Sequence, residues 1–274
     1  MDDIDRYLKE DLDLEGDITS ENLFNDETAK AKIISKENCI IAGLEELQIV
    51  FKKTGAKTKL KVKDGEFIKK NKIIAEINGP IKSILKGERL ALNFISKMSG
   101  IATETNKLTK KCKKINQNIQ IAATRKTTPG FRKYEKKAVI LGGGEPHRYG
   151  LYDAVMIKDN HIKFSGSIDK VIDKIIKKKL NKIIEVEVEN KKDALIAAKK
   201  KIDVLMLDNF KPHDAEITAN EVKKINKNIK IEISGGISNK NILKYAHFAD
   251  RISLGYITQS IKSKDFSLEI LWIY

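Results

Sequence analysis

The second half of the chain repeats one pattern of apolar and polar positions. Short runs rich in β-branched apolar residues end in polar residues or glycine, and amphipathic segments such as 190–201 and 215–228 lie between several of them. The runs are residues 119–126, 153–160, 182–190, 203–209, 229–236 and 250–256. Strands that alternate with helices form parallel sheets. The pattern therefore predicts an α/β fold with an incomplete, about six-stranded TIM-like barrel, and a doubly wound open sheet is the alternative.

The first part of the chain follows a different pattern. Apparent strands occur within residues 29–78, and residues 87–114 have the apolar spacing of one long helix, with Gly100 as the place where we expect any break. We therefore expect an N-terminal α+β sandwich domain with a linking helix over residues 1–115. The barrel should occupy residues 116–274, with the C-terminal tail packing back on the N-terminal domain.

Polar residues stand at the C-terminal end of each predicted barrel strand. They are Arg125 and Lys126, Lys158, Glu187, Asp208, the Ser234-Gly235-Gly236 turn and Gly255. In parallel α/β folds this end of the sheet binds ligands. Loops are polar in any protein, but charged side chains inside apolar runs are costly without partners. We therefore predict that these residues share one ligand site.

Arginine is scarce in this chain, so its positions are informative. The net charge is +15, yet only six of the 53 basic residues are arginine, and four of these lie within residues 89–148. These four are Arg89, Arg125, Arg132 and Arg148. Where lysine is the usual cation, an arginine indicates a need for the two-pronged guanidinium, which binds carboxylates and phosphates bidentately. Together with His147 and Lys158, the arginines predict a pocket for a dianionic acid.

Two acids stand opposite these cations. Glu187 and Asp208 end neighbouring predicted strands and should lie close together, and period-two alternation puts Glu185, Glu187 and Glu189 on one face of their strand. Such a pair can hold Mg²⁺, bind sugar hydroxyls or stabilise a cationic transition state, or it can simply neutralise lysines.

The remaining polar groups indicate phosphate binding without covalent catalysis. Backbone N–H groups at residues 234–236 and Gly255 can bind a phosphate. His161 fits either the site or a purely structural role. No residue pattern indicates a covalent nucleophile, so we expect transfer chemistry that depends on positioning and electrostatics.

Composition narrows the class of protein. No stretch approaches the roughly 18 consecutive apolar residues of a membrane span, and the acidic, polar N-terminus is unlike a signal peptide. Cys39 and Cys112 form no metal or disulfide pattern; we expect Cys39 to be buried, Cys112 to be an exposed thiol, and the protein to be cytoplasmic. The charge would suit a nucleic acid, but aromatic residues are only 6% and lysines are dispersed, so we expect neither a nucleic-acid nor a membrane partner.

Eight motifs in the same order resemble the quinolinate phosphoribosyltransferase family over nearly the whole chain. They are EGDITSENL (15–23), GERLALNFISKMSGIAT (87–103), TRKTTPGFR (124–132), GGGEPHRYGLYDAVMIKDNHI (142–162), EVEVEN (185–190), LMLDN (205–209), EISGGI (232–237) and ISLGYITQS (252–260). The resemblance implies phosphoribosyl transfer from phosphoribosyl pyrophosphate to quinolinate with decarboxylation, giving nicotinate mononucleotide for NAD biosynthesis. It also implies Mg²⁺ as cofactor and a homodimer, or a higher oligomer, in which each active site is completed by the partner's N-terminal domain.

The resemblance also assigns roles to individual residues. Arg89 would reach the quinolinate bound to the other subunit. The dicarboxylate pocket would be lined by Arg125, His147, Arg148 and Lys158. The catalytic residues would be Lys126, which bridges towards the phosphoribosyl donor, and Glu187 and Asp208, which hold the ribose hydroxyls and Mg²⁺. The 5′-phosphate would be bound by Ser234, Gly235, Gly236 and Gly255.

The sequence departs from the family at the rim of the expected pocket. Pro146 stands where the family commonly has Asn before the His-Arg pair. Two related enzymes are competing interpretations: a paralogue found with molybdate-transport genes, which should lack the KDNH segment seen here at 158–161, and a nicotinate phosphoribosyltransferase, which should need fewer carboxylate-binding cations.

Overall fold

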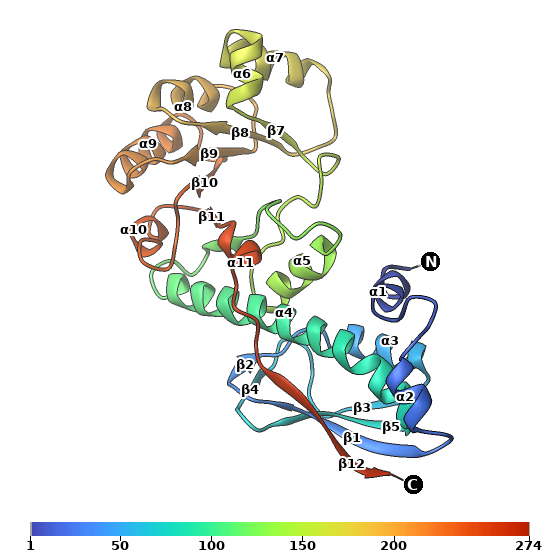
Figure 1. The fold of residues 1–274 in the computed structure, drawn as a ribbon. Coiled ribbons are helices and arrows are strands. Elements are labelled where there is room, and N and C mark those ends of the chain that lie inside the picture. Colours follow the sequence, from blue (N-terminus) through green and yellow to red (C-terminus); the bar gives the residue numbers. More distant parts are fainter. Residues whose placement is uncertain (1, 274) are drawn as a thin grey trace. The chain divides into compact units, whose positions relative to one another are not determined.

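The computed structural model describes residues 2–273, which separate into two compact units (Figure 1). Unit 1 comprises the described residues up to Glu104, residues 140–142 and the described residues from Ile261 onward. Unit 2 comprises residues 105–139 and 143–260. The compact units divide after Glu104, within the long helix. Compact units are not the same as independent domains, so the predicted domain boundary after residue 115 stays a prediction.

Unit 1 is built on a four-stranded antiparallel sheet in the order β12-β1-β5-β3. Its strands are β1 (Thr28–Ser35), β3 (Lys57–Leu60), β5 (Ile73–Pro80) and β12 (Phe266–Ile273). A two-stranded sheet joins β2 (Cys39–Ile40) to β4 (Phe67–Ile68). The helices are α1 (Asp3–Leu12), α2 (Ile18–Leu23), α3 (Leu44–Thr54) and the first part of α4 (Ile81–Lys113). The C-terminal strand β12 thus pairs with the first strand of the chain, β1.

Helix α4 is continuous, so the expected break at Gly100 is wrong. The helix begins directly after β5 and ends at Lys113, and it runs through the glycine without interruption. The reason for the glycine is close packing: a Cβ there would lie 2.5 Å from the backbone oxygen of Lys262. Gly100 therefore gives room to the segment that leads into β12.

The other end of α4 corrects a second expectation, because Cys112 is fully buried. It follows the buried Leu108 by four residues, so both side chains lie on the inner face of the helix while the neighbouring lysines point elsewhere. Burial raises the pKa of the Cys112 thiol to about 11. Cys39 is buried, as expected.

Unit 2 contains a six-stranded parallel sheet in the order β6-β11-β10-β9-β8-β7. The strands are β6 (Gln120–Ala122), β7 (Val155–Ile157), β8 (Ile184–Val188), β9 (Val204–Asp208), β10 (Lys230–Ser234) and β11 (Arg251–Ser253). Each strand falls within one of the six apolar runs. Within the described chain β6 and β7 pair with no further strand, so the sheet stays open, and the predicted incomplete α/β barrel is confirmed.

Helices follow the strands of unit 2 in the predicted alternation (Figure 1). They are the last part of α4, α5 (Arg132–Leu141), α6 (Asp159–Ser165), α7 (Ile168–Lys177), α8 (Lys191–Ala198), α9 (Pro212–Ile225), α10 (Leu243–Ala246) and α11 (Tyr256–Gln259). Helix α8 buries small apolar residues, namely Ala194, Ala197 and Ala198. Because all six strands are parallel, their C-terminal ends lie at one edge of the unit.

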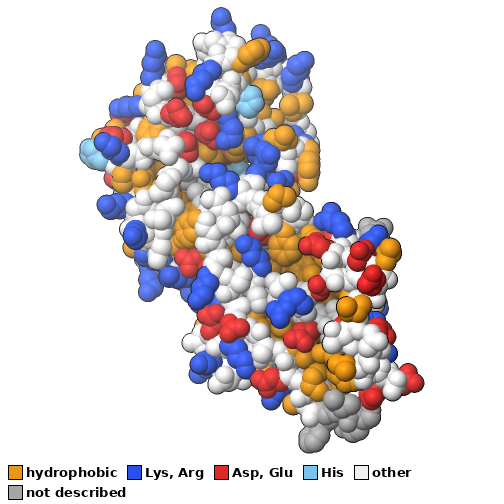
Figure 2. All heavy atoms as spheres, viewed as in Figure 1, with side chains coloured by type: hydrophobic (Ala, Val, Ile, Leu, Met, Phe, Trp, Pro, Cys, Tyr) orange, Lys and Arg blue, Asp and Glu red, His pale blue; other side chains and the backbone are white. Residues whose placement is uncertain are grey.

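The positive charge of the chain is dispersed over its surface. Lys and Arg side chains are scattered among acidic and apolar ones on the face in Figure 2, and they do not gather in one patch there. Many of the lysines form ion pairs, such as Lys200 with Asp169 and Asp173. Among residues 2–273, none of the helices is long and apolar enough to cross a membrane.

Candidate active site

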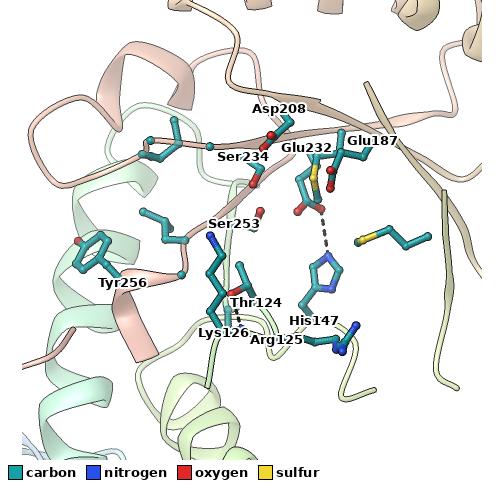
Figure 3. Close-up of a pocket in the computed structure, with 18 of the residues that line it drawn as sticks. Thr124, Arg125, Lys126, His147, Glu187, Asp208, Glu232, Ser234, Ser253 and Tyr256 are labelled. Atoms are coloured by element: carbon teal, nitrogen blue, oxygen red, sulfur yellow. Dashed lines mark hydrogen bonds and ion pairs between the residues drawn. The ribbon is translucent and has the colours of Figure 1, made fainter. Parts of the chain in front are cut away.

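A pocket of about 630 Å³ opens at the C-terminal ends of the strands in unit 2 (Figure 3). The structure brings together there all but two of the residues expected to form the site. These are Arg125, Lys126, His147, Arg148, Lys158, Glu187, Asp208, Ser234, Gly235, Gly236 and Gly255. The exceptions are Arg132, which is described below, and Arg89, which belongs to unit 1 and is exposed on α4.

Period-two alternation explains why these side chains converge. On β9 and β10, residues two apart point into the same pocket: Met206 and Asp208 on β9, and Glu232 and Ser234 on β10. Strand pairing aligns them, since Ser234 lies opposite Asp208 and Glu232 lies opposite Met206. The pocket side of the sheet thus has two layers, a polar one at the mouth and a second, more buried one beneath it.

One wall of the pocket is cationic. Arg148 contributes a guanidinium whose Nη1 donates to the Ala154 carbonyl at 3.4 Å and whose Nη2 lies 3.1 Å from the weak acceptor Met156 Sδ. Burial and the nearby Arg125 lower the pKa of Arg148. No carboxylate lies within ion-pair distance of the Arg148 guanidinium among the described residues, and the exposed Arg125 lines the same pocket. This wall can therefore bind an anion with two forked donors.

Arg132 has a different place. Its Nε donates to Thr127 Oγ1 at 3.0 Å and its Nη1 donates to the Tyr149 carbonyl at 2.9 Å. It does not line the pocket, and instead it ties the loop after β6 to the segment that follows Arg148. Arg132 thus supports the cationic wall from behind.

Carboxylates face the cations from the neighbouring strands. Glu187 forms an ion pair with Lys158, which stands at the end of β7 and the start of α6. Asp208 accepts from Asn209 Nδ2 at 2.6 Å. Both acids have oxygen atoms at the mouth of the pocket, and Mg²⁺ is typically bound by one or two carboxylates together with substrate phosphates and water. Glu187 and Asp208 therefore fit such an ion.

Lys126 is held at its backbone while its side chain stays exposed. The Lys126 N–H donates to Thr124 Oγ1 at 3.0 Å, and its carbonyl accepts from Thr258 Oγ1 at 2.7 Å. Its aliphatic stem crosses Gly255 so closely that a Cβ there would lie 2.8 Å from Lys126 Cδ. Gly255 is thus required for the path of the Lys126 side chain into the pocket.

The turn after β10 presents backbone to the pocket. Gly235 and Gly236 have φ values of +82° and +59°, a region that favours glycine. Asn209 packs against this turn and donates its N–H to the Ser234 carbonyl at 3.0 Å. Consecutive glycines in this conformation can direct backbone N–H groups at a phosphate.

The buried layer contains a charged network that our sequence interpretation missed. Arg251 on β11 contacts three carboxylates: Nη1 lies 2.7 Å from Glu145, Nη2 lies 3.2 Å from Glu185, and Nε pairs with Glu232. Glu185 and Glu232 are almost completely buried. The period of the strands could have revealed them, because each precedes a predicted pocket residue by two positions.

His147 joins this network to the pocket (Figure 3). Its Nε2 lies 3.3 Å from Glu185 Oε2 and 3.5 Å from Glu232 Oε2. Burial lowers the pKa of His147, but the two carboxylates outweigh burial and raise this pKa to about 9. Its Nδ1 accepts the Arg148 N–H at 2.8 Å, and this bond opposes protonation of Nδ1. The hydrogen bond at Nδ1 and the two carboxylates near Nε2 therefore favour, in the neutral ring, the tautomer with the proton on Nε2.

The three side chains His147, Glu185 and Glu232 also have the donor atoms of a metal site, with ligand atoms within 4.8 Å of one another. The guanidinium of Arg251 already contacts both of these carboxylates. Arg251 thus supplies the positive charge there, and the acids at the pocket mouth remain the better place for a metal ion.

His161 takes the structural role of the two considered. Its Nδ1 accepts the Lys158 N–H at 3.0 Å at the start of α6, and it does not line the pocket. It therefore helps to fix the backbone of Lys158.

Residues 17–99 match the model of the N-terminal domain of quinolinate phosphoribosyl transferase, and residues 101–269 match its C-terminal domain. A probable nicotinate-nucleotide pyrophosphorylase (carboxylating) of Methanocaldococcus jannaschii is 41% identical, over 97% of this chain and 96% of that protein. One from Archaeoglobus fulgidus is 39% identical, over 93% and 98%.

Solved structures of nicotinate-nucleotide pyrophosphorylases are similar to the structure of this chain. The nicotinate-nucleotide pyrophosphorylase of Francisella tularensis superposes with a TM-score of 0.90 at 38% identity, covering 98% of this chain and 94% of that one. The enzyme of Ehrlichia chaffeensis has a TM-score of 0.91 at 34% identity, covering 98% and 97%. The resemblance noted in the motifs is confirmed, and the chain belongs to the quinolinate phosphoribosyltransferase family.

Proposed function

We propose that this chain transfers a phosphoribosyl group from phosphoribosyl pyrophosphate to the ring nitrogen of quinolinate and releases CO₂, giving nicotinate mononucleotide for NAD biosynthesis. The observation that supports this most is the cationic wall of Arg125, Arg148 and Lys158, which faces carboxylates and a glycine turn within one pocket. A dicarboxylate, a sugar and a phosphate each find matching groups there. The family membership favours the same reaction.

Binding of quinolinate uses the cationic wall. Its two carboxylates pair with the guanidinium groups of Arg125 and Arg148 and with the Lys158 ammonium, which exchanges Glu187 for the substrate. A nicotinate carries one carboxylate fewer and would leave part of this charge unmatched. The wall thus selects a dicarboxylate, which argues against nicotinate as the acceptor.

Transfer depends on charge placed around the ribose. The 5′-phosphate binds the backbone N–H groups of residues 234–236, and Lys126 reaches the pyrophosphate. Glu187 and Asp208 bind the ribose hydroxyls and stabilise the positive charge that develops at C1 as the pyrophosphate leaves. Glu187 and Asp208 would hold Mg²⁺, which would supply positive charge to the pyrophosphate leaving group. The quinolinate nitrogen then bonds to C1.

Decarboxylation follows from the new pyridinium. The ring accepts the electron pair of the C2–carboxylate bond, CO₂ leaves, and C2 takes a proton from solvent. The protein's contribution is to hold the ring oriented in the pocket, because free rotation opposes loss of CO₂. We infer no covalent enzyme intermediate.

The test is release of CO₂ from quinolinate labelled in the 2-carboxylate, with and without phosphoribosyl pyrophosphate and Mg²⁺. We expect release that needs both and that Arg148→Ala abolishes. Lys223→Ala, which removes an ion pair with Asp250 elsewhere in unit 2, is the matched control and should keep full activity. A folded protein that releases no CO₂ would refute the proposal and favour another acid, as in the molybdate-associated paralogue.

We further propose that the active unit is a homodimer with shared sites. The support is that Arg89 is exposed on α4 and lies outside the pocket lining, although the family motif that contains it is intact. Arg89→Ala and Arg148→Ala should each be nearly inactive alone. In a random mixture about one quarter of wild-type activity should return, because half of the dimers would carry one complete site. No recovery after verified exchange of subunits would contradict shared sites.

A further inference from the structure

Arg251 is the centre of the buried network, and it joins segments far apart in the chain. Its partners lie on β8, on β10 and in the loop between α5 and β7, and all three contacts are made by separate nitrogens of one guanidinium. Only arginine has this number of fixed donors; a lysine has one nitrogen and cannot contact three carboxylates in this geometry. The arrangement therefore depends on Arg251 itself and not only on its charge.

The loop that the network holds bears Arg148, one of the three residues of the cationic wall. Glu145 is followed by Pro146, His147 and Arg148, and its backbone is already fixed to β6, since its N–H donates to Ile121 at 2.8 Å and its carbonyl accepts from Ala123 at 3.0 Å. The buried Lys136 donates to the Pro146 carbonyl. His147 has a φ of +55°, a strained value for a histidine. Such a conformation persists only where the surroundings impose it.

Both ring nitrogens of His147 are directed at the protein. Nδ1 accepts the backbone N–H of Arg148, and Nε2 faces Glu185 and Glu232. The ring thus presents no N–H to a ligand, although its surface lines the pocket. Its two contacts instead connect the buried carboxylates to the backbone of Arg148.

We propose that Arg251 and His147 are positioning residues: the Arg251–Glu145–Glu185–Glu232 network holds His147 in its left-handed conformation, and the ring in turn fixes Arg148 for the substrate carboxylate. This inference rests on the proposed function and adds a structural reason why the pocket is specific for quinolinate. Quinolinate is bound by the guanidinium groups and Lys158, and His147 sets their geometry without donating to the substrate.

The first experiment measures kinetics of Arg251→Lys and Glu145→Gln against Lys111→Met, which loses two hydrogen bonds to Asn239 elsewhere in unit 2. We expect both network variants to raise KM for quinolinate about tenfold, the scale of one charged hydrogen bond, and to leave KM for phosphoribosyl pyrophosphate within about twofold. Lys111→Met should change neither KM. A purely structural role would lower the active fraction, or change both KM values together, and would overturn the proposal.

The second experiment does not depend on activity. The chain has four histidines, so ¹⁵N-histidine NMR can resolve the His147 ring, identified by its loss in His147→Asn. Above the His147 pKa of about 9, we expect the neutral tautomer with the proton on Nε2, unchanged when quinolinate binds. A proton on Nδ1, or a change of hydrogen bonding at either nitrogen on binding, would overturn the proposal. An inactive wild type with the expected spectrum would refute the proposed function and leave the network intact.

Discussion

Two adjacent glycines in the turn after β10 allow a sharp test of phosphate binding. At Gly235 a Cβ would lie 2.2 Å from Asn209 Oδ1 and 2.6 Å from its backbone nitrogen, and φ is +82°. At Gly236 φ is +59°, but a Cβ would meet nothing within 4 Å. Gly235→Ala and Gly236→Ala therefore share the backbone strain, and only the first displaces a neighbour.

The expected magnitudes follow from this difference. The left-handed conformation costs an alanine about 1–2 kcal/mol, so Gly236→Ala should lower stability by that amount. Gly235→Ala adds about 1–3 kcal/mol of overpacking, because Asn209 and the turn must move apart. If the movement withdraws one N–H from the phosphate, the loss is about 1.5–3 kcal/mol, or roughly 10- to 150-fold in KM for phosphoribosyl pyrophosphate.

Steady-state rates with each substrate varied in turn supply the assay, and urea unfolding supplies the stabilities. We expect Gly235→Ala to raise KM for phosphoribosyl pyrophosphate without changing KM for quinolinate, and Gly236→Ala to stay near wild type in both. Equal kinetic defects in the two variants would refute the reasoning from steric contact. A defect of Gly235→Ala in quinolinate binding alone would refute the placing of the phosphate at this turn.

Three further predictions concern other parts of the chain. Arg148→Lys should raise KM for quinolinate at least tenfold in the CO₂ assay, because a single ammonium cannot replace the fork; a near-wild-type KM would show that charge alone suffices. Burial and the nearby Arg132 lower the pKa of Lys136 to about 8, below its unfolded value, so the free energy of unfolding should rise between about pH 8 and 10.5 in urea titrations, and Lys136→Met should lose this rise. Ellman's reagent at pH 8 should label neither Cys39 nor Cys112 until the protein is unfolded; labelling of the native protein would contradict their burial.

The sheet and the pocket mouth could be predicted because their signals are local. Each strand of unit 2 is an apolar run with a polar end, and parallel strands necessarily bring those ends to one edge. The residues so identified, from Arg125 to Gly255, line one pocket without any knowledge of long-range contacts. The pattern of apolar and polar residues along the chain was therefore sufficient to predict the pocket mouth.

The buried network could not be predicted in the same way, because it depends on ion pairs between residues that are far apart in the sequence. Arg251 contacts residues that are 106, 66 and 19 positions away in the chain, and each of these charges alone resembles a solvated residue. The expectation that Cys112 is exposed was wrong for a similar reason. The neighbouring lysines indicate a surface position, but Cys112 lies on the inner face of its helix and is buried. The break expected at Gly100 failed because the segment that packs against it lies at the other end of the sequence.

The pairing of β1 with β12 has a consequence for synthesis of the chain. Strand β1 is among the first elements to leave the ribosome, yet one of its two partners, β12, is the last. At bacterial or eukaryotic rates of translation, one edge of β1 stays uncovered for tens of seconds. Unpaired edges invite association with other strands, so the nascent chain has to protect this edge until β12 emerges. Unit 2, which is complete by Ser260, can fold first, although it is encoded second.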